Sequence, residues 1–126
     1  QPRGQKWSGS AMTIKQVMET LDAELLTPEA DLTREVHAAC GSDMMSDVLA
    51  YVKDQAVLVT GLNNPQVVRT ADMMDMICIV FVRGKKPDGA ILQLAVDRGI
   101  AVLATKLPMF AACGLLYEKG LRGGMA

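Results

Sequence analysis

The sequence has 126 residues, which is the length of one domain and enough for a single sizeable core. Half of the residues are hydrophobic and 21% are charged, as in ordinary globular proteins. The net charge of −1 argues against nucleic acid as a partner, because phosphate binding needs a basic surface. There is no signal-peptide pattern and no apolar run near the roughly 20 residues that cross a bilayer, which predicts a cytoplasmic protein without a membrane partner.

The cysteine and histidine pattern predicts neither a metal nor another cofactor. Cys40, Cys78 and Cys113 are far apart, lie in apolar neighbourhoods and form no CxxC pair, so we interpret them as reduced packing residues. His37 is the only histidine, and no further metal ligands stand at suitable spacing. We expect it to be a half-exposed strand residue.

The ends of the chain differ in pattern from its middle. Residues 1–11 have no hydrophobic period, which predicts a flexible extension or a segment that is not native, with Met12 as a plausible natural start. Residues 12–119 form the expected domain. Residues 120–126 are glycine-rich and predict a loose tail.

The first third of the chain mixes short elements. Thr13 and Gln16 have the spacing of a capping box, and the helix that they predict carries an apolar face of Ile14, Val17, Met18 and Leu21. A short strand over 23–26 and a second over 35–40 follow. Ser42 or Asp43 is expected to cap the next helix, whose apolar side comprises Met44, Met45, Val48, Leu49 and Val52.

From residue 57 onward, buried strands alternate with amphipathic helices. Strands are predicted over 57–60, 76–82 and 100–104, from continuous apolar runs typical of strands that are covered on both faces. Asn64 caps a helix that starts at Pro65, and a further helix closes near Gly99. Their expected inward residues are Val67, Val68, Ala71 and Met74, then Ala90, Ile91, Leu94 and Ala95. Pro108 opens a last helix through Tyr117, with Phe110, Cys113 and Tyr117 at helical spacing.

This alternation defines the expected fold class. Strands joined by helices through short connections favour a mainly parallel sheet with right-handed crossovers. We therefore predict an α/β protein, a small three-layer domain with a mainly parallel sheet.

Motifs of known catalytic sites are missing from the sequence. Gly84-Lys85 lacks the preceding glycine and the following hydroxyl residue of a phosphate-binding loop. The sequence has neither GxGxxG after a strand nor GxSxG. We therefore predict a protein that is not an enzyme. The alternative is an enzyme of unrecognised type, which would need His37, Asp43 and Asp47 within contact distance.

Polar segments follow three predicted strands and are expected to meet at one edge of the sheet. Together they offer helix N-terminal amides, hydroxyl and amide groups and three cations, a combination that suits a nucleotide or another phosphate-bearing small molecule. The alternative is that the polar side chains only cap helices and the basic loop is solvated. The candidate ligand-binding residues are Gly41, Ser42, Asp43, Ser46, Asp47, Thr60, Gly61, Asn63, Asn64, Arg83, Gly84, Lys85 and Lys86.

Methionines cluster at residues 44–45 and 73–76. Core packing accounts for most of them, and members off the inward faces would form an apolar patch suited to self-association.

From Met12 to Tyr117 the sequence resembles the DRTGG domain, which is related to the N-terminal domain of HPr kinase/phosphorylase. The residues that carry the resemblance are Met12-Thr13-Ile14-Lys15, Leu32-Thr33-Arg34-Glu35-Val36, Gly41-Ser42-Asp43-Met44-Met45-Ser46-Asp47-Val48-Leu49, Val80-Phe81-Val82-Arg83-Gly84-Lys85-Lys86-Pro87-Asp88 and Gly99-Ile100-Ala101-Val102-Leu103-Ala104-Thr105.

The resemblance implies a fold like that of the HPr kinase N-terminal domain and a regulatory or dimerising role without kinase activity. Family members occur alone and beside CBS or phosphate acetyltransferase domains. The resemblance therefore implies a homodimer and a regulatory partner protein. This chain departs from the family where Gly61-Leu62-Asn63 replaces glycine-aspartate-arginine and Val82-Arg83-Gly84 replaces threonine-glycine-glycine.

Overall fold

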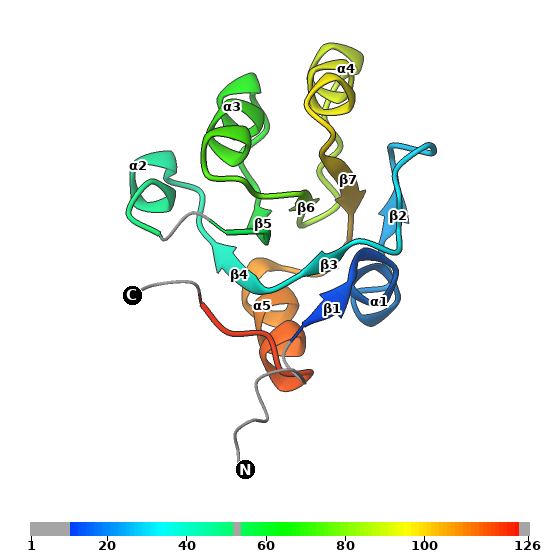
Figure 1. Ribbon diagram of the computed structural model, residues 1–126, viewed down its shortest axis with the longest axis vertical. Helices are drawn as coiled ribbons and strands as arrows, with labels where there is room; N and C mark the ends of the chain where they lie inside the picture. Colours follow the sequence, from blue (N-terminus) through cyan, green and yellow to red (C-terminus); the bar gives the residue numbers. More distant parts are fainter. Residues whose placement is uncertain (1–10, 52–53, 124–126) are drawn as a thin grey trace.

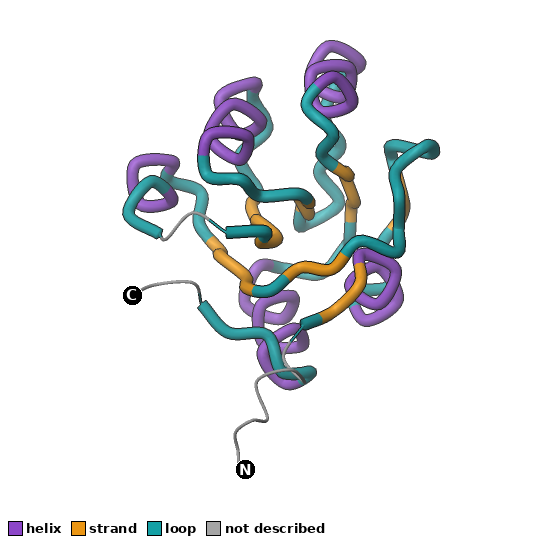
Figure 2. The backbone as a smooth tube through the Cα atoms, in the orientation of Figure 1, coloured by secondary structure: helices purple, strands orange, loops and turns teal. Residues whose placement is uncertain are grey.

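A five-stranded sheet forms the centre of the molecule (Figures 1 and 2). The structure is a computed structural model that describes residues 11–51 and 54–123. The strand order is β2-β7-β6-β5-β4. The four parallel strands are β4 (Ala38–Gly41), β5 (Ala56–Thr60), β6 (Cys78–Phe81) and β7 (Ala101–Ala104). β2 (Glu24–Leu25) pairs antiparallel with β7 at one edge. Within the described residues, no helix has the length and apolar character needed to span a membrane.

Helices cover both faces of this sheet (Figure 1). The crossovers step in one direction from β4 to β7, so their helices α2 (Met45–Val48), α3 (Pro65–Met73) and α4 (Gly89–Asp97) lie on the same face. The other face carries α1 (Ile14–Thr20), α5 (Met109–Glu118) and a small antiparallel pair, whose strands are β1 (Met12–Thr13) and β3 (Glu35–Val36). The predicted three-layer α/β fold is confirmed.

Alternating strand residues divide the core into two halves. Leu58, Ile79 and Phe81 face α2, α3 and α4, whereas Val59 and Val80 face α1 and α5. All five are 0% exposed. This is why the central strands read as continuous apolar runs rather than as alternating ones.

The predicted strand over 35–40 is two strands in different sheets. β3 pairs with β1, and after His37 the chain continues as β4, which pairs with β5. The prediction of a single strand was wrong, because the chain passes from pairing with β1 to pairing with β5 without a turn residue that would mark the break in the sequence. His37 has a side chain that is 47% exposed, which confirms the expected half-exposed position, but the residue lies between the two strands and not in a strand as expected.

Two of the three predicted helix caps are confirmed. Thr13 and Gln16 form both bonds of the capping box, and the Asn64 side chain accepts a hydrogen bond from the Gln66 amide. The prediction for α2 was wrong, because Met44 stands at its N-cap without a side-chain bond. Ser42 hydrogen-bonds Met44, and Asp43 points toward β5.

Some predicted apolar faces lie partly outside the core. Ala90 is exposed on α4, and Met44 and Leu49 are 59% and 47% exposed around α2. Val52 lies outside the described residues. The segment predicted to be a loose tail is packed over 120–123: Leu121 is 1% exposed, and the Ala39 amide on the free edge of β4 donates to the Arg122 carbonyl.

The three cysteines are free thiols; Cys40 and Cys78 are buried as predicted, whereas Cys113 is only half-buried. Cys78 is 0% exposed in β6, and burial raises its pKa to about 12 from the ordinary 9.0. Burial also raises the pKa of the Cys40 and Cys113 thiols.

We expect Cys78 to resist thiol reagents in the folded protein and to react in denaturant, because only the exposed thiolate is nucleophilic. As the pH rises above 9.0, the Cys78 thiol ionises in the unfolded chain before it ionises in the folded protein. The contribution of this thiol to the free energy of unfolding should therefore be lost between pH 9.0 and about 12. Urea unfolding at several alkaline pH values, with Cys78→Ala as the comparison, checks the second point. A variant with the same alkaline loss of stability as the wild type would contradict it.

Candidate functional site

The loops after β4 and β5 meet through Asp43. Its Oδ1 accepts hydrogen bonds from the Thr60 hydroxyl at 3.1 Å and from the Gly61 amide at 2.6 Å. Thr60 is 0% exposed and its hydroxyl oxygen also accepts from the Leu62 amide at 3.1 Å. The Gly61 amide at the end of β5 therefore already donates to the Asp43 carboxylate, and a bound anion would have to displace this carboxylate to use the amide.

The loop after β6 reaches the same place through Arg83. Its guanidinium lies against Gly61, so closely that a Cβ at Gly61 would stand 2.9 Å from the Arg83 Cζ. Arg83 has a φ of 58°, in the left-handed region, and Gly84 follows with 73°. Left-handed backbone is costly for a residue such as arginine and is often found at functional sites. Within the described residues the guanidinium makes no hydrogen bond or ion pair.

The two lysines of this loop differ in their surroundings. The Lys86 ammonium is 2.9 Å from a Glu24 carboxylate oxygen on β2, with which it forms an ion pair. The Lys86 carbonyl accepts a hydrogen bond from the Asn63 side chain at 3.2 Å, which ties this loop to the loop after β5. Lys85 is exposed and forms no ion pair with a described residue.

Several predicted site residues have structural roles or lie apart. A Cβ at Gly41 would stand 2.5 Å from the Cys113 sulfur, so a larger residue at this position would force the Cys113 side chain to move. Asn64 caps α3. Ser46 and Asp47 are exposed on α2, outside the contacts between the three loops. The structure thus brings together Asp43, Thr60, Gly61, Asn63, Arg83, Gly84 and Lys86.

A fourth loop at this edge was missed by the sequence reasoning. The segment after β7 accepts backbone hydrogen bonds from the loop after β6, Arg83 to Leu107 at 2.8 Å and Gly84 to Thr105 at 2.9 Å. A cavity of about 360 Å³ lies beside it, lined in part by Lys86 and Lys106. The sequence did contain a signal for this loop. Thr105-Lys106 directly follow the predicted strand over 100–104, just as the other three polar segments follow predicted strands.

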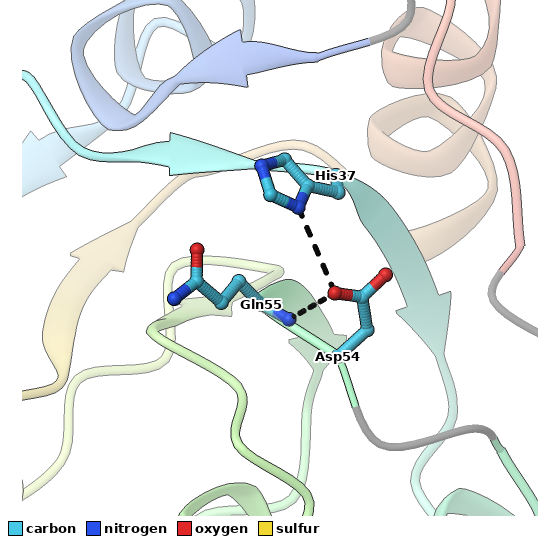
Figure 3. A network of polar contacts seen from close by, with 3 residues as sticks. All are labelled: His37, Asp54 and Gln55. Atoms are coloured by element: carbon cyan, nitrogen blue, oxygen red, sulfur yellow. Dashed lines mark hydrogen bonds and ion pairs between the residues drawn. The ribbon is translucent and has the colours of Figure 1, made fainter. Parts of the chain in front are cut away.

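His37 lies at the opposite end of β4 from Asp43. Figure 3 shows it beside Asp54, whose Oδ1 is 3.6 Å from the His37 Nδ1 and also accepts from the Gln55 amide. Asp43 follows the carboxyl end of β4, whereas His37 precedes its amino end. The enzyme alternative required these residues together, and the structure separates them. Among the described residues, no three histidine, cysteine or acidic side chains are grouped so as to hold a metal.

The fold is that of a small three-layer α/β module. In this module, hydrogen bonds join the loops that follow the carboxyl ends of the parallel strands. The sequence profile of the DRTGG domain matches residues 16–118, and the chain belongs to this domain family. A search of the curated proteins finds no match.

A solved structure shares the fold at 16% sequence identity with a TM-score of 0.68. It is the regulatory region of a pyrophosphatase from Clostridium perfringens, comprising CBS and DRTGG domains, in complex with the activator diadenosine tetraphosphate. The alignment covers 92% of this chain and 49% of that structure, so the present chain spans about half of its length.

Proposed function

We propose that this chain is a non-catalytic regulatory module of a bacterial-type cytoplasmic system, which acts as a homodimer and on a partner protein. Its membership of the DRTGG domain family supports this role. So does the presence of a DRTGG domain in the regulatory region of the Clostridium perfringens pyrophosphatase.

The observation that carries the dimer is the outer face of α5. Phe110 is 91% exposed and Tyr117 is 61% exposed, although both occupy one side of a helix whose inner side is packed on the sheet. Between them, a Cβ at Gly114 would meet nothing within 4 Å. The Arg122 guanidinium lies 3.9 Å over the Tyr117 ring, which leaves Phe110 as the uncovered ring. An uncovered ring beside an open position suits an interface between identical helices, in which Phe110 of each copy fills the gap at Gly114 of the other.

Light scattering at increasing micromolar concentration tests this proposal. We expect a concentration-dependent dimer for the wild type and a monomer for Phe110→Ser. Met73→Ser is the matched control, since Met73 is 56% exposed on α3, on the opposite face of the sheet. A wild-type protein that stays monomeric would refute the dimer, and equal effects of the two substitutions would refute its placement on α5.

A second candidate function is a sensor for a nucleotide or a phosphorylated metabolite at the carboxyl edge of the sheet. The observation that favours it is Arg83, whose guanidinium lies against Gly61 while making no polar contact with the described residues. An arginine with free donors is well suited to phosphate oxygens. The Clostridium perfringens neighbour was solved with a nucleotide activator, which adds support for a nucleotide ligand.

Replacing Arg83 with glycine should separate binding from stability. Glycine tolerates the left-handed backbone, so the free energy of unfolding should stay unchanged or rise by up to about 1 kcal/mol, whereas Arg83→Ala keeps the strain. Both variants should lose any increase in melting temperature that nucleotides or sugar phosphates give the wild type. A screen without any such increase would count against the sensor, and an increase that survives in both variants would exclude Arg83 from the site.

A further inference from the structure

A second cavity lies at the other end of the sheet, away from the three loops described above. It measures about 460 Å³ and is bounded by the 27–34 segment, the end of α4 and the start of β7. That volume is within the range of small-molecule pockets. Most of its lining is apolar and includes Ile14, Ile77, Val96 and Ile100.

The segment that closes this cavity is anchored at both ends. On one side the Leu26 amide donates to the Val102 carbonyl, and the Val102 amide donates to the Thr27 hydroxyl, at 2.9 and 3.1 Å. On the other side the Ile14 amide donates to the Arg34 carbonyl at 2.9 Å. A cavity between a strand and a segment fixed in this way is formed before any ligand arrives, which lowers the entropy cost of binding.

Charged groups of both signs border the apolar lining. Glu29 and Asp31 are on the closing segment, and Arg34 lies where this cavity adjoins a polar hollow of about 640 Å³. The Arg34 guanidinium donates one hydrogen bond, to the Gly99 carbonyl at 3.1 Å, and has further donors. Val96, in the last turn of α4, also lines this cavity, and the C-terminal end of a helix carries partial negative charge.

Asp31 and Arg34 influence each other without pairing. Hydrogen bonds from Thr33 hold the pKa of the Asp31 carboxyl below its usual value, and the charge of Arg34 lowers it further. Asp31 is therefore anionic at neutral pH. The two charges nevertheless form no ion pair within the described residues, and both residues belong to the lining of the same cavity.

We propose that this cavity binds a small zwitterion with an apolar side chain, an α-amino acid of the leucine or phenylalanine type. Its ammonium group would lie by Asp31 and Glu29, its carboxylate by Arg34, and its side chain against Val96 and Ile100. A purely apolar ligand would leave the charged rim unused, and a simple anion would meet two carboxylates. This site is independent of the proposed dimer and of the sensor.

Isothermal titration calorimetry of the full chain tests the proposal with L-leucine and L-phenylalanine as probes. Isoamylamine, which lacks the carboxylate of leucine, and isocaproate, which lacks its ammonium group, should each bind about tenfold more weakly or worse. Absence of binding for both amino acids would overturn the proposal, as would equal binding of leucine and either analogue.

Substitutions assign each charge to its partner. Arg34→Gln should abolish the preference for leucine over isoamylamine, and Asp31→Asn, which retains an oxygen for the Thr33 bonds, should reduce the preference over isocaproate. Val96→Ser should weaken all three ligands, and because Val96 is 49% exposed the variant should fold. Arg83→Ala, at the other edge, should leave leucine binding unchanged. If Arg34→Gln retains the full preference, or if Arg83→Ala removes the binding, the assignment is wrong.

Discussion

Replacing Phe81 with alanine should lower the free energy of unfolding by about 3–5 kcal/mol. Phe81 is 0% exposed at the end of β6 and belongs to the half of the core that α2, α3 and α4 cover. The substitution removes a whole ring from a closely packed region and leaves a cavity that the surrounding strands cannot collapse to fill. Urea denaturation followed by circular dichroism measures the loss.

The same substitution at Phe110 is the matched control, because these are the two phenylalanines of the sequence and Phe110 is 91% exposed. At a protein concentration that keeps the chain monomeric, Phe110→Ala should change the free energy of unfolding by less than about 0.5 kcal/mol. Equal losses for the two variants would mean that α5 does not present Phe110 to solvent.

The second large effect is expected at Asp43. Replacing it with alanine removes the acceptor for the Thr60 hydroxyl and the Gly61 amide, both in residues that are buried. Buried donors without acceptors are costly, so we expect a loss of about 1–3 kcal/mol in the free energy of unfolding. The loops after β4 and β5 should also separate, which amide hydrogen exchange at Gly61 would detect.

Two variants make this measurement specific. Asp47→Ala removes a carboxylate one helical turn away, on the exposed surface of α2, and should have little effect on stability. Asp43→Asn keeps an oxygen that can accept both hydrogen bonds and should lose less than Asp43→Ala. If Asp47→Ala proved as destabilising as Asp43→Ala, the contact between Asp43 and β5 would not be the cause.

The sequence predicted the elements that carry their own local signals. α3 has a capping residue at Asn64, proline at its first position and inward residues at helical spacing, and it forms as expected. The central strands were found because burial on both faces leaves an unbroken apolar run, as in β6. The parallel sheet then follows from the alternation of such runs with helices.

Features that depend on distant partners could not be predicted in this way. The strand expected over 35–40 divides because β1, more than twenty residues earlier in the chain, pairs with its first part. Asp43 suits a helix cap locally, but its acceptor oxygen is used by Thr60 and Gly61, which are 17 and 18 residues further along. Phe110 and Tyr117 do share one face of α5, and only the packing of α5 shows that this face is turned outward.

The location of the candidate site at the carboxyl edge could be predicted from the sequence, but the contacts between its residues could not. Loops after neighbouring parallel strands must lie close together, and those containing Asp43, Gly61 and Arg83 do so. The sequence carries no sign that Asp43 would occupy the Gly61 amide or that Lys86 would turn to Glu24. The binding role of the thirteen predicted residues stays a prediction.

The two faces of the sheet differ in which parts of the chain cover them, and this has a consequence for folding. α2, α3 and α4 each connect neighbouring strands, so that layer assembles from contacts between nearby segments. The opposite layer joins α1, near one end of the described chain, to α5, near the other, and the two helices contact each other. Closing so long a loop is slow and entropically costly. We therefore expect this layer to assemble last and to open first, which would uncover Val59 and Val80 while the rest of the sheet stays folded.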